Sequence, residues 1–237
     1  MATSTSRIGT FTRNCSYNAI QDGQNLCQEV DSGMSDGLNP NGYYSQNDEE
    51  RFILEWTPKD GRLLDIGAWW PTNLSNSRAL IESGWSAVLV EPSPGPMRVL
   101  LGEYGANNDV KLLQAAVTSH GTPITMHITD YPVSTSNHEV YSLWRTDPLT
   151  KYIGRLIVPS ITIGSLLRDC GSFDFIDIDA EGQSVQIAKQ LLEQPDAMLP
   201  QCFCVEHDGH HEELCRIATE RGYKKFHLTA ENLVAAR

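Results

Sequence analysis

The chain has 237 residues, which suits one α/β domain with a sizeable core, or one such domain with an additional arm. Its formal net charge of −12 argues against nucleic acid or an anionic membrane as a partner, because both require a positive protein surface. No apolar run reaches the length of a membrane span and the N-terminus lacks a signal-peptide core, so a cytoplasmic location is expected.

Residues 1–42 are predicted to form an irregular arm, and the folded domain is expected to extend over residues 43–237. The first 42 residues are rich in Ser, Thr, Asn, Gly and Asp and contain few large apolar side chains. Ser45 then begins a helical pattern in which it can cap the helix while acidic residues fill the first turn. Because this helix leads into the first strand, Gln46 is expected near the cofactor, and plain capping of the helix is the alternative.

A strand followed by a glycine turn is predicted at residues 63–68. The segment is apolar apart from Asp65 and ends in Gly67 and Ala68. This pattern is typical of a buried parallel strand that brings the chain to the ligand-binding edge of a sheet. A helical pattern follows, so strand, turn and helix form the first part of a nucleotide-binding unit.

A second apolar run, residues 87–90, ends at Glu91 and Pro92. An acid in this place can accept hydrogen bonds from ribose hydroxyls. The third predicted strand is followed by Ala115 and Ala116, whose small side chains leave room for a flat adenine ring. The predicted cofactor contacts are Gln46, Asp65, Gly67, Ala68, Glu91, Pro92, Ala115 and Ala116.

The turn after the first strand favours S-adenosylmethionine (SAM) over a dinucleotide. A dinucleotide site uses three glycines so that the backbone can approach a pyrophosphate, whereas here Gly67 precedes Trp69, Trp70 and Pro71. SAM has a ribose and an adenine but no phosphate, and needs one glycine beside its amino-acid moiety. The missing glycines disfavour an NAD-linked oxidoreductase, and an ordinary turn with a surface glutamate is the structural alternative.

Two later segments carry the residues predicted to act in catalysis. Residues 173–178 predict a strand that runs into Asp179 and Glu181, and residues 203–206 predict a strand that ends at His207. If these strands are neighbours, the polar residues at their ends converge, and one of them can accept a proton from an acceptor hydroxyl. Asp179, Glu181 and His207 are the predicted catalytic residues. The alternative for the two acids is that they cap the next turn.

No metal is predicted, although carboxylates with histidine can bind Mg²⁺, Mn²⁺ or Zn²⁺. His210 and His211 begin a predicted helix and point in different directions. Glu206 and His207 are adjacent on a strand, so their side chains face opposite sides. The six cysteines show no paired framework, which favours a reducing compartment.

Strands and helices alternate along most of the chain, and two consecutive strands are predicted at its end. This order implies an α/β fold with a mostly parallel sheet and an antiparallel edge strand. Residues 131–150 are predicted to form a loop on the acceptor side.

Short motifs occur in a set order over about residues 43–237. They are Ser45-Gln46-x-Asp48-Glu49, Leu64-Asp65-Ile66-Gly67-Ala68, Val90-Glu91-Pro92, Ala115-Ala116-Val117, Ile178-Asp179-x-Glu181-Gly182, Val205-Glu206 and Asn232-Leu233-Val234. On these motifs the chain resembles the FkbM family of class I SAM-dependent methyltransferases. The resemblance implies a Rossmann-like, seven-stranded sheet with helices on both faces. It also implies methyl transfer, often to hydroxyls of sugars or polyketide-like metabolites.

Two positions depart from the family pattern. Trp69, Trp70 and Pro71 stand where the family has Asn or Asp and then Gly, and Asp177 stands where it often has Lys, which predicts a more acidic pocket. We expect an O-methyltransferase that acts on a small-molecule or carbohydrate acceptor. The alternative is a non-catalytic SAM-binding or structural α/β protein that has lost turnover, and the Trp-Trp-Pro turn is its best support.

Overall fold

The computed structural model describes residues 38–129, 134–146 and 150–237. The arm predicted over residues 1–42 therefore lies almost wholly outside the described residues. Within the described ranges, no helix is long and apolar enough to cross a membrane. The cysteines of those ranges are all free thiols: Cys170, Cys202, Cys204 and Cys215.

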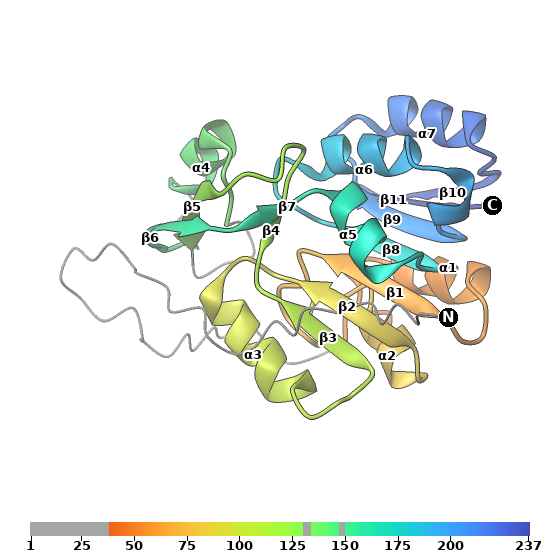
Figure 1. The fold of residues 1–237 in the computed structure, drawn as a ribbon, viewed down its shortest axis with the longest axis horizontal. Coiled ribbons are helices and arrows are strands. Elements are labelled where there is room, and N and C mark those ends of the chain that lie inside the picture. The colour runs from red at the N-terminus through yellow and green to blue at the C-terminus, as the bar shows by residue number, and fades with distance from the viewer. Residues whose placement is uncertain (1–37, 130–133, 147–149) are drawn as a thin grey trace, which may run out of the picture.

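A seven-stranded sheet forms the centre of the fold (Figure 1). In spatial order its strands are β10 (Lys225–Leu228), β11 (Asn232–Ala236), β9 (Cys202–Glu206), β8 (Phe175–Ile178), β1 (Arg62–Ile66), β2 (Ser86–Val90) and β3 (Val110–Leu113). β11 runs antiparallel to β9 and β10, and the other neighbouring pairs are parallel. The predicted Rossmann-like sheet with antiparallel pairing at one edge is confirmed, and the antiparallel strand lies one place in from that edge.

Helices cover both faces of this sheet, as predicted (Figure 1). One layer contains α1 (Glu49–Trp56), α2 (Arg78–Glu82) and α3 (Pro94–Tyr104), and the other contains α5 (Ile163–Cys170), α6 (Ser184–Leu192) and α7 (His211–Glu220). Side chains of the strands alternate between the layers, so that Leu63 and Leu89 face the first while Leu64 and Val90 face the second. Burial on both faces explains why the central strands are continuous apolar runs.

A smaller part of the structure borders the ligand-binding edge. It contains β4 (Ala116–Val117) paired with β7 (Ser160–Ile161), and the antiparallel pair β5 (Ile124–Thr129) and β6 (Tyr152–Val158). Met126, Ile128 and Val158 form its buried core. A short 3-10 helix (Asp196–Met198) joins α6 to β9 on the far side.

The prediction of a loop over residues 131–150 is wrong where α4 (His138–Trp144) forms. With seven residues this helix is too short for its periodicity to be recognised in the sequence. Tyr141 stacks on His127 of β5, with the ring centroids 3.8 Å apart, so a tertiary contact supports the helix. Residues 130–133 and 147–149 lie outside the described residues.

The loops after β1 and β8 meet at Gly67. The N–H of Asp179 donates to the Ile66 carbonyl at 2.8 Å, which extends the pairing of the two strands beyond their ends. Gly67 has a φ of 90°, and a Cβ there would overlap the carbonyl oxygen of Asp179. Glycine is required because the backbone conformation and the neighbouring loop both exclude a side chain.

We predict that Gly67→Ala lowers the free energy of unfolding by at least about 2 kcal/mol more than Gly84→Ala. Gly84 has a similar φ of 98° but has no atom within 4 Å of its Cβ position, so it isolates the cost of the backbone conformation. That cost alone is about 1–2 kcal/mol. Urea unfolding of both variants measures the difference, and equal losses would show that the two loops do not require their close contact.

Candidate cofactor and active site

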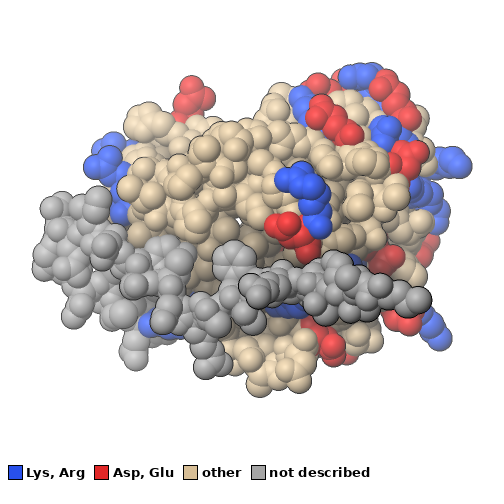
Figure 2. Space-filling view, viewed as in Figure 1, with Lys and Arg blue, Asp and Glu red and all other residues tan. Residues whose placement is uncertain are grey.

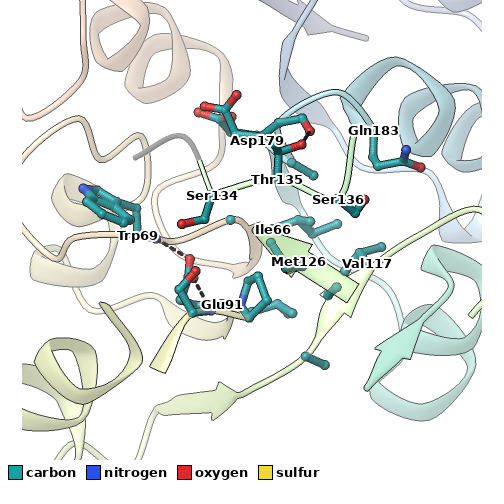
Figure 3. A pocket seen from close by; sticks show the side chains of 18 of the residues that line it. Ile66, Trp69, Glu91, Val117, Met126, Ser134, Thr135, Ser136, Asp179 and Gln183 are labelled. Atoms are coloured by element: carbon teal, nitrogen blue, oxygen red, sulfur yellow. Dashed lines mark hydrogen bonds between the residues drawn. The ribbon is translucent and has the colours of Figure 1, made fainter. Parts of the chain in front are cut away.

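A cavity opens where the carboxyl ends of β1, β2 and β8 meet residues 134–136 (Figure 3). Open α/β sheets bind their ligands at this edge. Of the eight predicted cofactor contacts, the following six line the cavity: Gln46, Gly67, Glu91, Pro92, Ala115 and Ala116. Asp179 and Glu181, two of the three predicted catalytic residues, line it as well.

Apolar side chains form one part of the cavity wall. Val90, Ala115 and Val117 contribute from the sheet side, and Met126 contributes from β5. Small and flat apolar surfaces of this kind suit an adenine ring. The role of Met126 is absent from the sequence prediction, because alternation over residues 124–128 predicts a strand but not which ligand the strand faces.

Glu91 is oriented by two backbone N–H groups. Its side chain is buried, its Oε2 accepts from the N–H of Trp69 at 3.1 Å, and its Oε1 accepts from the N–H of Ser93 at 2.6 Å (Figure 3). Burial raises the pKa of Glu91 to about 7, while the hydrogen bonds from Ser93 and Trp69 act in the opposite direction. Each oxygen retains a lone pair, so the carboxylate is placed to accept hydrogen bonds from a ribose.

The Trp-Trp-Pro turn is compatible with this cavity. Trp69 has a φ of 36°, which is rare for a bulky residue. Its side chain lines the cavity while its N–H bonds Glu91, and its ring lies 6.2 Å from that of Trp70. The turn therefore replaces the glycines of a dinucleotide site with a bulky wall and still orients the predicted ribose acceptor.

Asp65, Ala68 and His207 do not line the cavity. The carboxylate of Asp65 accepts the hydroxyl of Ser77 at 2.6 Å beneath the turn, and Ala68 packs in the core. Nδ1 of His207 accepts the N–H of Gly209 at 3.0 Å, so its ring stabilises the turn after β9. The structure thus gives these three residues supporting positions below or beside the site.

Asp65 and Asp177 form a buried carboxyl pair under the cavity. They are register partners on β1 and β8, with 3% and 5% of their surfaces exposed. The Asn76 amide donates to both oxygens of Asp177 at 3.2 Å. Burial, followed by repulsion from Asp65, raises the pKa of Asp177 well above its ordinary value, and burial raises that of Asp65 to about 6. The expectation that Asp177 makes the lining of the pocket more acidic is wrong, because its carboxyl is buried and does not line the cavity.

Asp179 and Glu181 line the cavity, and Glu206 joins them in a cluster of three carboxyl groups. Their oxygens all lie within 4.8 Å of one another. Protein surrounds Asp179 on most sides although the residue remains open to solvent. Burial, followed by repulsion from Asp177 and Asp65, raises the pKa of Asp179 to about 7. Burial, followed by repulsion from Asp179, raises the pKa of Glu206 to about 8 and that of Glu181 to about 9. The cluster can therefore exchange protons near neutral pH. Such spacing would also suit a divalent cation, and the absence of a metal stays a prediction.

The chain matches the model of the methyltransferase FkbM domain over residues 65–224. It belongs to this family. The resemblance drawn from the sequence motifs is confirmed, and family and fold together support a SAM-dependent methyltransferase. A comparison with curated proteins found no match.

Solved structures that resemble this FkbM-family protein do so at low sequence identity. The fibrillarin pre-rRNA processing protein of Methanococcus jannaschii has 15% identity and a TM-score of 0.45, over 92% of this chain and 86% of that one. A precorrin-6y C5,15-methyltransferase of Geobacter metallireducens has 11% identity and a TM-score of 0.42, over 85% and 93%. A TehB-like SAM-dependent methyltransferase of Corynebacterium glutamicum has 12% identity and a TM-score of 0.40, over 82% and 88%.

We predict that Asp177→Asn stabilises this FkbM-family protein more at pH 8 than at pH 5. The folded-state pKa of Asp177 is raised, so stability is lost as the pH rises from the ordinary value of 3.8 through the folded pKa. An amide does not titrate and avoids this loss, and Asn76 can turn its unpartnered Oδ1 toward it. Urea unfolding at pH 8 should show a gain of about 1 kcal/mol or more.

The exposed Asp109 provides the control for this prediction. Asp109→Asn removes one negative charge from the surface, so its effect on the free energy of unfolding should be small, within about 0.5 kcal/mol at either pH. If Asp177→Asn changed stability equally at pH 5 and pH 8, the buried carboxyl pair would not carry the energetic cost assigned to it.

Proposed function

We propose that the protein transfers the methyl group of SAM to a hydroxyl group of a small-molecule or carbohydrate acceptor. The observation that carries this proposal is the placement of Glu91 and the carboxyl cluster around one cavity. Glu91 would hold the ribose, and the small apolar residues Ala115 and Ala116 would contact the adenine. The acidic cluster then lies where a positive sulfonium is electrostatically favourable.

The residues of the cluster have different acid–base roles in this proposal, because their pKa values differ. Bound SAM would supply an electrophilic methyl group on a sulfonium. Asp179, with a pKa of about 7, is best matched to accept the proton of an acceptor hydroxyl at neutral pH. Glu206 and Glu181, with pKa values of about 8 and 9, remain largely protonated there, and Glu181, which lines the cavity, can donate a hydrogen bond to another hydroxyl of the acceptor. Positioning of the hydroxyl by these groups supplies much of the rate.

The polar side of the cavity favours a neutral acceptor rich in hydroxyl groups. Ser134, Ser136 and Gln183 line it with groups that both donate and accept hydrogen bonds. None of the described residues that line the cavity is Lys or Arg. An anionic acceptor, such as a sugar phosphate, would meet the acidic cluster without a compensating cation, which is costly.

The distribution of surface charge supports a small acceptor over nucleic acid or a membrane. On the face seen in Figure 2, basic and acidic side chains are interspersed. Lys189 pairs with Glu213, and Arg216 pairs with Glu220, so part of the positive charge is locally neutralised. Such mixing does not build the positive field that polyanionic partners require. A cytoplasmic location remains a prediction from the sequence.

We predict that Glu91→Gln weakens SAM binding by about 1–3 kcal/mol at pH 8, as for loss of a charge-assisted hydrogen bond. In the unaltered protein, affinity should fall as the pH drops through about 7, because protonation of Glu91 removes its charge. Isothermal titration calorimetry between pH 6 and 8.5 measures both effects. Glu55→Gln, on the exposed side of α1, is the matched control. Equal affinity for SAM in all three proteins would refute the ribose assignment.

We predict that Asp179→Asn lowers turnover by about 10²–10⁴-fold, the usual contribution of a general base, while SAM affinity changes by less than about tenfold. Turnover is followed as formation of S-adenosylhomocysteine with a panel of sugars and small hydroxylated metabolites. Asp109→Asn removes an exposed acid that does not line the cavity and should retain activity. Full activity of Asp179→Asn would end the catalytic assignment. SAM binding without turnover on any acceptor would favour the non-catalytic alternative.

A further inference from the structure

We propose that Thr135 is a positioning residue that ties the β5 side of the cavity to the loop after β8 and thereby holds Glu181 against Asp179. The proposal deepens the proposed function, because it rests on the carboxyl cluster as the acid–base group. Thr135 itself lines the cavity, and its hydroxyl reaches the loop after β8 at the carbonyl oxygen of Glu181. It acts through the backbone of Glu181.

Thr135 is itself held firmly. Only 2% of its surface is exposed, and its backbone forms a two-way bridge with His127 of β5, with N–O distances of 2.8 and 3.1 Å. Its hydroxyl accepts the N–H of Asn137 at 3.0 Å and donates to the carbonyl oxygen of Glu181 at 2.7 Å. Because the hydroxyl both donates and accepts, its single proton is directed at Glu181.

The backbone of Glu181 needs such a restraint. Its φ of 27° lies in the left-handed region, which a residue with a side chain adopts only when its surroundings enforce it. Gly182 follows with a φ of 83°. If the backbone of Glu181 relaxed to an ordinary φ, the rotation about its N–Cα bond would also turn its side chain. The carboxyl group would then move away from Asp179 and Glu206.

A second buried hydroxyl holds the other end of the same loop. Ser184 accepts the N–H of Ala180 at 2.9 Å and donates to Glu206 at 3.2 Å. Both partners of Ser184 belong to the β8–β9 side of the cavity. The bond from Thr135 crosses to this side from the segment that also carries Ser134 and Ser136, and all three residues line the cavity (Figure 3). The wall that faces the acceptor and the loop that carries Glu181 are thus joined through one hydroxyl group.

The test measures the ionisation of Glu181 in the full chain, without SAM or an acceptor. Glutamate labelled with ¹³C at its carboxyl carbon is followed by NMR across pH 5 to 10.5, and the Glu181 signal is assigned by its loss in Glu181→Gln. We expect the apparent pKa of about 9 to be retained in Thr135→Ser, which keeps the hydroxyl. In Thr135→Val the acid dissociation constant of Glu181 should rise by about tenfold or more, because the carboxyl leaves its acidic neighbours.

Thr125→Val is the matched control, since Thr125 is exposed on β5, the strand to which Thr135 is bridged, and should leave the titration unchanged. An unchanged Glu181 titration in a folded Thr135→Val protein would overturn the proposal. If the valine variant does not fold, Thr135→Ala is read in the same way. The readout involves no methyl transfer, so a failure of the proposed function would appear in the Asp179→Asn assay and not here.

Discussion

The close contact between Gly67 and the carbonyl oxygen of Asp179 brings the cofactor turn and the catalytic loop together. Neighbouring parallel strands lie about 4.8 Å apart, and here the hydrogen bond from Asp179 to Ile66 continues the pairing past the last residue of each strand. A side chain at position 67 would force these loops apart. The separation between the predicted ribose acceptor, Glu91, and the predicted base, Asp179, is therefore set by sheet geometry rather than by flexible loops.

Carboxyl groups dominate the site. They form three sets, namely Glu91, the buried pair of Asp65 and Asp177, and the cluster around Asp179, and each set is stabilised differently. Glu91 is held by two backbone N–H groups, and the buried pair below the turn is held by an amide, a hydroxyl and protonation. The cluster around Asp179 is held by one buried serine and by proton sharing among its members. Burial without a cationic partner raises the pKa values of all three sets, so a cationic ligand would be attracted to this edge and would displace protons from it.

The sequence predicts the sheet well because its central strands are buried on both faces and appear as uninterrupted apolar runs. It also places Gly67 and Glu91 at the ends of predicted strands, and both line the cavity in the structure, while their contact with a cofactor stays a prediction. His207 shows the limit of such reasoning. Alternation along a strand places Glu206 and His207 on opposite faces, but it does not say that Glu206 joins the cluster around Asp179 while His207 bonds the turn after β9.

The β5 side of the cavity is the part that the sequence does not reveal. Thr135 belongs to an irregular stretch without hydrophobic periodicity, and its partner Glu181 lies 46 positions away along the chain. The helix α4 depends on stacking between His127 and Tyr141, which is a tertiary contact. Local patterns predict elements, whereas contacts of this kind become visible only when the chain is folded.

A crystal structure of the protein with S-adenosylhomocysteine tests the central claim most directly. The account predicts both ribose hydroxyls within hydrogen-bond distance of Glu91, the adenine beside Ala115 and Ala116, and the sulfur atom directed toward Asp179. A nucleoside bound elsewhere, or a cavity in which Glu91 contacts only the backbone N–H groups of Trp69 and Ser93, would contradict it.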